Sequence, residues 1–427
     1  MKMTSVLPKS YLCFLVLCCA SVHAENWPRF RGPNGQGHSL EKDLPVTWTE
    51  NEYLWTVSLP GMGYSSPVIW GEKVFITCAT KDNSKAWLLA YHTGTGRELW
   101  KQTYQFQPAK MDRVNSLAAS TPAVDEEHVY ALWYGKAETL LVALDHTGKE
   151  IWCKDFGLTY LRHGPCTSPI LYRDMVIFTQ EQDRQSKQPE CKWIAVHKQT
   201  GHIRWIVTRG STNYASYSVP CVYTDKQGKD VLVFSSHQHG ITAVDPSTGT
   251  VVWETEGVLP SSVVSSPVIA GDFIVNTCGS GGGGKQLAVV RPPETTGQGP
   301  EVVYTSQDKF VTYVSTGISV DTLVFLYHDQ GTVTCIDSMT GKVNWSQKPA
   351  GRFYSSPVCA NGMLYCMDMD GKVVIIKATD SYEIVGIMDL GEKTQASISI
   401  ANGRIFLRTL TRLVCVGKKT LMVNPLP

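Results

Sequence analysis

The stretch Ala243-VDPSTGTVV-Trp253 decides the fold, because close copies of it recur along the chain. Aspartate or a hydroxyl residue hydrogen-bonds the backbone of a tight turn, and the glycine of the Thr-Gly pair accepts positive φ without a Cβ clash. Apolar and polar residues alternate on either side of the turn, which is typical of a half-buried hairpin. The tryptophan is a large flat group suited to packing against the neighbouring copy. The other copies are Ala90-YHTGTGREL-Trp100, Ala143-LDHTGKEI-Trp152, Ala195-VHKQTGHIR-Trp205 and Cys335-IDSMTGKVN-Trp345.

A second phrase lies between these copies and begins with a hydroxyl residue two positions before a proline. Proline starts a strand with little harm, because its missing N–H falls at the strand end. The good copies are Ser65-SPVIWGEKVFIT, Ser120-TPAVDEEHVYAL, Thr167-SPILYRDMVIFT, Ser218-VPCVYTDKQGKDVLVF, Ser265-SPVIAGDFIVNT and Ser355-SPVCANGMLYCM. Weaker copies begin near Ser315 and Ser397.

Together the two phrases predict four strands per repeat, and counting them gives the architecture. Strands of the first kind begin near residues 66, 121, 168, 218, 266, 316, 356 and 397. Only seven strands of the fourth kind follow within the run, and the eighth is the segment Glu52-YL-Trp55 ahead of the first repeat. We therefore predict an all-β, eight-bladed β-propeller of four-stranded antiparallel blades, closed by an N-terminal strand that completes the last blade. The tryptophans predicted to dock neighbouring blades are Trp55, Trp100, Trp152, Trp205, Trp253 and Trp345.

The composition excludes several classes of protein. Lys+Arg 39 against Asp+Glu 38 leaves no excess of positive charge for a nucleic-acid partner. An apolar content of 43% excludes a disordered chain. Past the first twenty residues no apolar run approaches the roughly 20 residues that span a bilayer. We expect a globular protein without a transmembrane segment after its signal.

The N-terminus has the pattern of a signal peptide. Lys2 and Lys9 precede a short apolar stretch, and Val22-His-Ala24 ends in the small residue typical of a cleavage site. We predict a signal peptide over residues 1–24, an extended segment over 25–50 and a single propeller over 51–427. Because Leu17 precedes Cys18, where lipidation needs a small residue, no lipid anchor is expected. The chain is predicted to be periplasmic or secreted, and monomeric.

Thirteen cysteines occur, of which three fall in the predicted signal. No two of the remaining ten lie close enough for a zinc-binding pair. Export permits disulfides, and the sequence leaves their pairing open, but we expect buried free thiols. Cys359 and Cys366 flank an Asn-Gly turn, where a two-residue hairpin would place Cys359 opposite Leu364.

The repeat A-x-D-x-x-T-G-x-x-x-W resembles the tryptophan-docking repeat of the pyrroloquinoline-quinone (PQQ) type propellers, and the resemblance covers essentially the whole chain after the signal. The segments Asn26-WPRFRGPNGQG, Leu44-PVTW and Leu54-WTVSLPGMGYSSPV are similar to exported PQQ-like propellers often labelled outer-membrane-assembly-like proteins. This resemblance implies a disc with a central funnel. It does not imply an activity, because fold and site are separate questions.

For a quinoprotein dehydrogenase the resemblance would imply adjacent cysteines over the cofactor, an aspartate base and Glu/Asn/Asp ligands to calcium. The only adjacent cysteines, Cys18 and Cys19, lie in the predicted signal, and no motif matches the other groups. The resemblance is therefore to the scaffold and not to the catalytic set. We expect no cofactor, and PQQ with calcium remains the alternative.

A ligand site is expected where the loops between blades, and those between second and third strands, surround the funnel mouth. Eight-fold geometry directs their polar and aromatic side chains at one axial cavity. Any single one of them is equally explained as a solvated loop residue. The candidate ligand-binding residues are Arg113, Asn115, Arg162, His163, Asn213, Tyr214, Tyr217, His237, His239, Tyr313, His328, Arg352 and Tyr354.

Three shorter motifs are weaker. His237 and His239 could begin a transition-metal site with His163 or His328, but no third ligand is assigned and no metal site is predicted. The run Gly279-SGGGG-Lys285 lacks the following hydroxyl residue and helix of a phosphate-binding loop, and we expect a flexible loop there. Asp368-MDG lacks the remaining ligands of a calcium loop and is expected to form a tight turn.

No nucleophile motif occurs, so no catalytic residue is predicted. Two functions remain. The first is a non-catalytic binding or scaffold propeller with a protein, peptide or glycan partner at the funnel face or rim. The second is an oxidoreductase of quinoprotein type, or another small-cofactor enzyme, with its site in the funnel. Arg113, Arg162 and Arg352 around one deep cavity would favour a small anionic ligand, whereas a shallow mouth would favour a protein.

Overall fold

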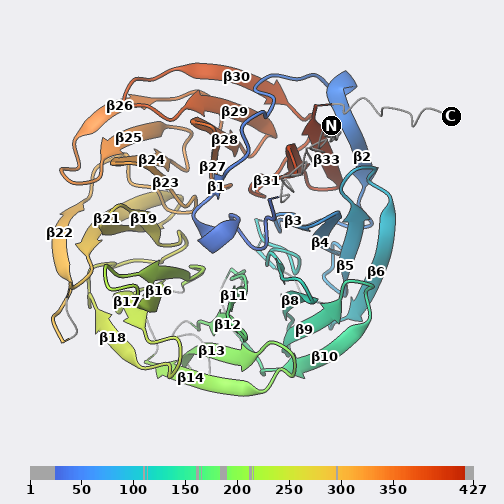
Figure 1. Cartoon of the computed structure of the whole chain (residues 1–427), viewed down its shortest axis with the longest axis horizontal. Coiled ribbons are helices and arrows are strands. Elements are labelled where there is room, and N and C mark those ends of the chain that lie inside the picture. Colours follow the sequence, from blue (N-terminus) through green and yellow to red (C-terminus); the bar gives the residue numbers. More distant parts are fainter. Residues whose placement is uncertain are drawn as a thin grey trace, which may run out of the picture.

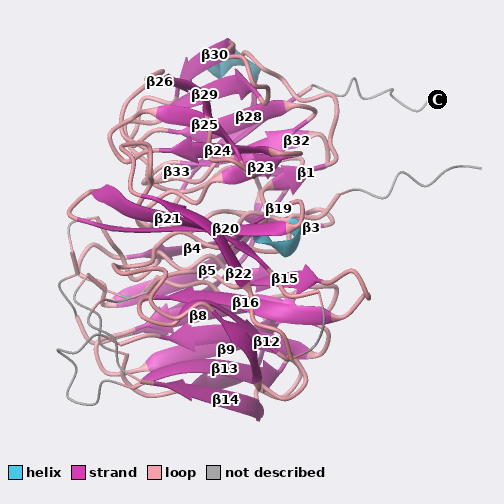
Figure 2. Cartoon of the chain, turned by 90° about the vertical axis from the view of Figure 1, so that its left-hand side faces the viewer, coloured by secondary structure: helices cyan, strands magenta, loops and turns pink. Residues whose placement is uncertain are grey.

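The computed structural model describes residues 25–108, 111–112, 114–159, 163–164, 166–182, 190–210, 214, 216–294 and 297–418. Eight antiparallel sheets stand around a central axis like the blades of a propeller (Figure 1). Seen from the side, the strands cross a disc between two faces covered by loops (Figure 2). The predicted all-β, eight-bladed propeller is confirmed. The predicted signal peptide lies outside the described residues.

The first four blades each hold four strands, which follow one another from the axis to the rim (Figure 1). Blade 1 consists of β3 (Val68–Trp70), β4 (Lys73–Ala79), β5 (Lys85–His92) and β6 (Glu98–Gln105). Blade 2 consists of β7 (Ala123–Val124), β8 (His128–Tyr134), β9 (Thr139–Asp145) and β10 (Glu150–Asp155). Blade 3 consists of β11 (Ile170–Tyr172), β12 (Met175–Gln180), β13 (Cys191–His197) and β14 (Ile203–Arg209). Blade 4 consists of β15 (Cys221–Thr224), β16 (Asp230–Ser236), β17 (Gly240–Val244) and β18 (Val251–Glu254).

The next three blades repeat this order. Blade 5 consists of β19 (Val268–Ala270), β20 (Phe273–Ser280), β21 (Gly283–Arg291) and β22 (Glu301–Ser306). Blade 6 consists of β23 (Ile318–Val320), β24 (Leu323–Tyr327), β25 (Val333–Asp337) and β26 (Val343–Gln347). Blade 7 consists of β27 (Val358–Ala360), β28 (Met363–Met367), β29 (Lys372–Lys377) and β30 (Ile384–Asp389), with β1 (His38–Ser39) added parallel to β27.

The last blade joins the two ends of the chain. Blade 8 consists of β31 (Ser399–Ala401), β32 (Arg404–Arg408), β33 (Arg412–Gly417) and the N-terminal strand β2 (Tyr53–Ser58). Trp55 of β2 pairs antiparallel with Cys415 of β33. This pairing supplies the missing fourth strand and leaves the ring without an open blade. The predicted closure is therefore present.

The outer strand of one blade is held against the next by its aromatic residue. The Nε1–H of Trp100 donates to the carbonyl of His146 at 3.0 Å, in the tight turn of blade 2. Gly148 of that turn has a φ of 89°, and a Cβ placed on it would stand 2.6 Å from the indole of Trp100. Only glycine therefore permits the contact. The other indoles that donate to a carbonyl of the next blade are those of Trp55, Trp152, Trp205 and Trp345.

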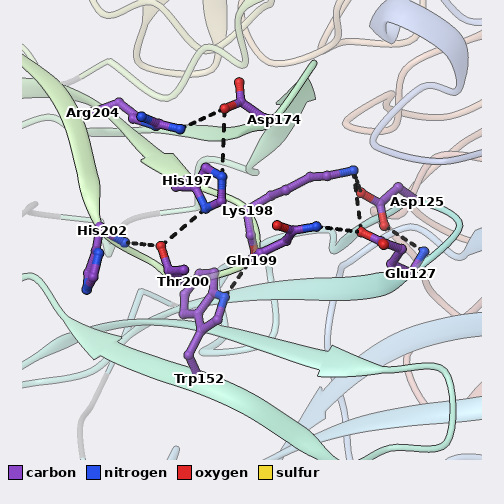
Figure 3. A network of polar contacts seen from close by, with 10 residues as sticks. All are labelled: Asp125, Glu127, Trp152, Asp174, His197, Lys198, Gln199, Thr200, His202 and Arg204. Atoms are coloured by element: carbon purple, nitrogen blue, oxygen red, sulfur yellow. Dashed lines mark hydrogen bonds and ion pairs between the residues drawn. The ribbon is translucent and has the colours of Figure 1, made fainter.

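Polar side chains add to this contact between blades 2 and 3 (Figure 3). Trp152 donates to the carbonyl of Lys198, whose ammonium reaches back to Asp125 at 2.9 Å. In the same turn region Arg204 and His197 both face Asp174. The turn of blade 3 therefore supplies both the carbonyl that accepts from Trp152 and the ammonium group that pairs with Asp125 of blade 2.

Residues 25–39, here called the plug segment, close one end of the central opening. The segment lies near the axis in Figure 1, includes the 3-10 helix η1 (Pro33–Gly35), and leads to a second one, η2 (Glu50–Glu52). Its backbone pairs with Ile69 of blade 1, and its carbonyls accept from the N–H groups of Val124 in blade 2 and Cys359 in blade 7. Asn34 and Gln36 bond the backbone of blades 4 and 5. The opening thus becomes a funnel with a floor.

The structure places the described cysteines and two of the predicted turns. The ten described cysteines are free, and eight of them are buried. Cys359 pairs with Leu364, as predicted. The glycine run lies at the predicted connection between the second and third strands of its blade, but most of it is strand, because β20 and β21 pair as far as Ser280 and Gly283 and leave a two-residue turn. Glycine in a strand marks a close approach of another backbone, and a Cβ on Gly284 would collide with the carbonyl of Val311. Among the described residues no helix is long and apolar enough to cross a membrane.

Candidate functional site

A ring of hydroxyl side chains surrounds the axis just before the inner strands begin. Six of them stand at the second position of the repeated phrase, and Ser397 takes the same place in the last blade. Each oxygen accepts a backbone N–H of the preceding blade at 2.9–3.1 Å. These bonds stitch neighbouring blades together at the centre, where the backbone amides would otherwise be buried without acceptors. We call the seven residues the hydroxyl ring: Ser66, Thr121, Ser168, Ser266, Thr316, Ser356 and Ser397.

Blade 4 interrupts the ring. Its phrase reads Ser218-Val219-Pro220, so an apolar side chain occupies the position that carries a hydroxyl in the other blades. The Oγ of Ser218, one position earlier, is buried without a hydrogen-bond partner among the described residues. Blades 3 and 4 therefore lack the central bond found at the other seven boundaries.

Above the ring lies a cavity with a volume of ≈ 480 Å³. All eight blades line it, and Phe30 of the plug segment contributes to it from below. A cavity of this size on the axis of a closed ring accommodates a small ligand or a short segment of a larger one. Its lining comes from the loops between blades and from the residues just before the inner strands, as expected from the blade topology.

Four tyrosines and one cysteine stand in the wall of the cavity. Tyr64, Tyr313 and Tyr354 line it from blades 1, 6 and 7, and Tyr217 from blade 4. Burial raises the pKa of Tyr64 and of Tyr313, so both phenols are neutral at physiological pH. Cys166 also faces the cavity, and burial raises the pKa of its thiol to about 12. A thiol held protonated in this way is a poor nucleophile.

His163 and Asp112 form a pair of titratable side chains at the rim. His163 Nδ1 lies 2.9 Å from Asp112 Oδ2, which joins the loops that lead into blades 2 and 3. Asn115 strengthens this junction by donating to the carbonyls of His163 and Gly164. Both members of the pair are partly exposed, at 56% for His163 and 33% for Asp112. The junction shapes the mouth of the cavity on that side.

The structure divides the candidate residues into three groups. The candidates that line the cavity are Asn115, His163, Tyr217, Tyr313 and Tyr354. The described candidates that do not line it are Tyr214, His237, His239, His328 and Arg352. The candidates that lie outside the described residues are Arg113, Arg162 and Asn213. Of the three predicted cations, Arg352 is the one that can be placed, and it donates to the hydroxyl of Tyr354 at the rim.

The paired histidines lie between blades 3 and 4 instead of in the cavity. His239 Nδ1 is 2.7 Å from a guanidinium nitrogen of Arg209, which also pairs with Glu254. The Arg209 guanidinium stands 5.2 Å from the ring of Trp193. Burial, and then the nearby charge of Arg209, lower the pKa of His239. His239 is thus a contact between blades.

The hypothetical metal site of His237 and His239 gains no third ligand. His163 is paired with Asp112, and the Nδ1 of His328 accepts from the backbone of Gln330. In the described part of the chain no three His, Cys, Asp or Glu side chains gather in a way that could hold a metal ion. Asp368 instead accepts three backbone N–H groups and forms the predicted turn.

Sequence reasoning missed the residues that form the bottom of the cavity. The sequence shows a hydroxyl residue at the second position of most phrases and Val219 as the exception in blade 4. It does not show that this position faces the axis. Phe30 carries no repeat signal, because the plug segment occurs once in the chain. Tyr64 does carry one, since it directly precedes the phrase at Ser65, as Tyr217 and Tyr354 precede the phrases of their own blades.

The described lining does not fit PQQ with calcium. Asp112 is its one carboxylate and is paired with His163. Calcium takes six to eight oxygen ligands, usually with several carboxylates among them. The described lining also holds no arginine or lysine to meet the carboxylates of the quinone. The hydrogen-bond donors of the described lining are mainly hydroxyls, phenols and side-chain amides such as that of Asn115.

The closed ring of eight blades, docked by tryptophans around an axial cavity, defines the class of PQQ-like propellers. The chain belongs to the family described as outer membrane protein assembly factor BamB, which matches residues 84–302 and 305–384. Comparison with curated proteins finds no match.

Solved structures share the fold at low identity. BamB from Moraxella catarrhalis is 15% identical, with a TM-score of 0.58, over 86% of this chain and 97% of that one. The quinohemoprotein alcohol dehydrogenase from Comamonas testosteroni is 12% identical, with a TM-score of 0.65, over 92% of this chain and 81% of that one. The computationally designed Ika8 protein is 12% identical, with a TM-score of 0.56, over 86% and 99%. At these identities the likeness concerns the fold alone.

Proposed function

We propose that the chain is an exported, non-catalytic binding propeller whose axial cavity holds a segment of a protein or peptide partner. The observation that carries the proposal is the cavity itself, which all eight blades build and whose wall is aromatic and hydroxyl-rich. Tyrosine offers a large contact area with little loss of conformational entropy, as in other binding surfaces. The name of the family, an assembly factor for outer membrane proteins, points in the same direction.

The chemistry of the lining supports binding over catalysis. The protonated thiol of Cys166 lacks the activation that a nucleophile needs, and Asp112 is paired with His163 at a partly exposed rim. The remaining polar groups of the described lining are the hydroxyl ring, tyrosine phenols and the amides of Asn115 and Gln395. A rigid ring that presents variable loops suits a scaffold.

Site-specific photocrosslinking in cells tests the proposal. A benzophenone amino acid replaces Tyr313 or Tyr354 in the cavity, and Tyr223, at the outer end of blade 4's inner strand, serves as the matched control. We expect both cavity positions to capture the same protein or peptide, and Tyr223 not to capture it. Equal capture from Tyr223, or none from the cavity, would contradict the proposal. An adduct removed by glycosidases and not by proteases would replace the peptide by a glycan.

The quinoprotein alternative makes a separate prediction. Calorimetric titration of the calcium-loaded protein with PQQ should then give micromolar or tighter binding, weakened by Arg352→Ala. Such binding, weakened by the variant, would favour a redox function over the binding propeller. Its absence at high micromolar PQQ would leave the binding propeller.

A further inference from the structure

The deep end of the cavity carries an unusual set of hydrogen-bond donors. All seven members of the hydroxyl ring line the cavity, and each is at most 5% exposed. A serine or threonine hydroxyl has one proton to donate and two lone pairs to accept. Each ring oxygen already accepts a backbone N–H, and within the described chain no protein atom takes its proton. The ring therefore has donors to offer toward the axis.

Two arginines of the plug segment lie directly beneath this ring. The guanidinium of Arg31 donates to the carbonyl of Gly317 at 2.7 Å and lies 3.5 Å from that of Pro357. These residues follow ring members Thr316 and Ser356 in the sequence. Arg29 donates to the carbonyl of Pro220 at 2.6 Å, next to Val219. Both guanidinium groups therefore sit one residue below the plane of the ring.

Neither guanidinium has a counter-ion among the described residues. Arg31 is 0% exposed and Arg29 is 6% exposed, and their hydrogen bonds go to backbone carbonyls. Neither takes part in an ion pair with a described carboxylate. Buried charges are normally paired, and two unpaired cations at one place raise the local potential in a medium of low dielectric constant.

Both side chains stay charged at neutral pH. Burial lowers the pKa of Arg31 to about 9 and that of Arg29 to about 10, and both values lie above 7. The floor of the funnel is thus positive, although the cavity lining itself includes neither arginine. The positive charge could not be predicted from the funnel loops, because both arginines belong to the plug segment.

We propose that the hydroxyl ring binds a carboxylate group, with the O–H donors on its oxygens and the charges of Arg29 and Arg31 beneath it. Donors that point at one place in a positive field favour an anionic oxygen group over a neutral one. A single negative charge fits better than two, because neither guanidinium reaches the cavity to bond the ligand directly. The carboxylate is supplied by the C-terminus of a peptide or by a small free acid.

The missing hydroxyl at blade 4 makes the cavity asymmetric and orients the ligand. On that side Tyr217, Val219 and Val264 line the cavity with apolar and aromatic surface, where the other blades present hydroxyls. The organic part of the ligand packs there and against Phe30, while the carboxylate faces the hydroxyls. This inference rests on the proposed function and names the group that the cavity recognises.

Calorimetry on the folded chain tests it with three probes: N-acetyl-Gly-Tyr with a free carboxylate, the same peptide as its C-terminal amide, and acetate. We expect the free-acid peptide to bind at least tenfold more tightly than the amide. Acetate binding as tightly as the peptide would assign the site to a small free acid. Equal affinity for acid and amide, or no heat from either carboxylate, would overturn the proposal.

A matched pair of variants locates the binding at the ring. Thr316→Val keeps the shape and removes the O–H donor, and Thr316→Ser retains it. We expect at least fivefold weaker binding for the valine variant and less than twofold change for serine. If Thr316→Val is too unstable to study, Ser356→Ala removes the donor of the neighbouring ring member and should weaken binding at least threefold. An unchanged affinity in the variant that folds would place the carboxylate elsewhere.

The two proposals fail in different ways. A partner captured from Tyr313 and Tyr354 together with equal binding of acid and amide would retain the binding propeller and reject the carboxylate. Binding of the acid to the ring without any captured partner would retain the carboxylate site and reject the protein partner.

Discussion

The backbone N–H of Ser397 in the last blade donates to the Oγ of Ser66 in the first, at 3.1 Å. The same bond joins six of the other seven boundaries, and together these bonds turn eight separate sheets into a ring. The β2–β33 pairing closes the circle at its outer edge, and the Ser66–Ser397 bond closes it at the centre. The first and last blades are therefore joined by two separate contacts, one at the outer edge and one at the centre.

The docking glycines should be sensitive to a single methyl group. Gly148→Ala places a Cβ 2.6 Å from the indole of Trp100 in a left-handed backbone, and should destabilise by about 2–4 kcal/mol from strain and overpacking. Gly157, with a φ of 81° and open space around it, separates the two causes. Gly157→Ala should cost only about 1–2 kcal/mol of strain. Urea unfolding measures both, and equal losses would show that the indole contact is irrelevant.

The interrupted ring should be repairable. Val219→Thr supplies an acceptor for the N–H of Ser168, as the hydroxyls of the other blades do for their neighbours. We expect a gain of about 0.5–1.5 kcal/mol in the free energy of unfolding. Val264→Thr puts a hydroxyl into the same cavity away from the ring and should give no gain. The idea fails if the two variants behave alike in thermal melts.

The plug segment should contribute strongly to stability through Arg31. Arg31→Met removes the donor to the carbonyls of Gly317 and Pro357 and leaves them buried without it. The expected loss is about 2–4 kcal/mol, since each buried carbonyl left unpaired costs about 1–3 kcal/mol. Arg97→Met, at an exposed turn, is the control and should change stability little. A small effect of Arg31→Met would mean that the plug segment is held by its backbone pairing alone.

Acid should weaken the contact between blades 3 and 4. The pKa of His239 is lowered by burial and by Arg209, with the carboxylates of Glu254 and Glu256 acting in the opposite direction. The unfolded chain binds a proton near about pH 6.5 and the folded chain at lower pH. Below about pH 6.5 the unfolded state therefore holds more protons, and stability falls as the pH falls.

Replacing this histidine isolates its share. His239→Gln keeps an oxygen that accepts from Arg209 and does not titrate, so the fall in stability between pH 7 and 5 should become shallower. His237 and His146 also have lowered pKa values, and a part of the slope remains. Parallel pH profiles for the variant and the original chain would show that His239 does not contribute. Urea unfolding at several pH values provides the profiles.

The repeat by itself carried the architecture. A Thr-Gly turn acts through its nearest neighbours, and a tryptophan four residues later meets the next copy, so both signals are local in the sequence. Counting strands was then enough to assign Trp55 to the last blade, and β2 pairs with β33 as that count required. Of the ten described loop candidates five line the cavity and five do not. The sequence could not separate the two groups, because a loop residue points to the axis or away from it with no change in its sequence neighbours.

Only the tertiary structure decided how the cavity is built. Ser66 and Ser397 are 331 residues apart, and their contact depends on the closure of the whole ring. Arg29 and Arg31 lie beneath the hydroxyl ring because the plug segment crosses the axis, a path that no periodicity encodes. Tyr354 lines the cavity while Arg352, two residues earlier, does not, because both lie in a loop where the regular alternation of a strand does not fix the direction of a side chain. The sequence determined the repeats and their number, and the convergence of eight blades on one axis determined which side chains meet.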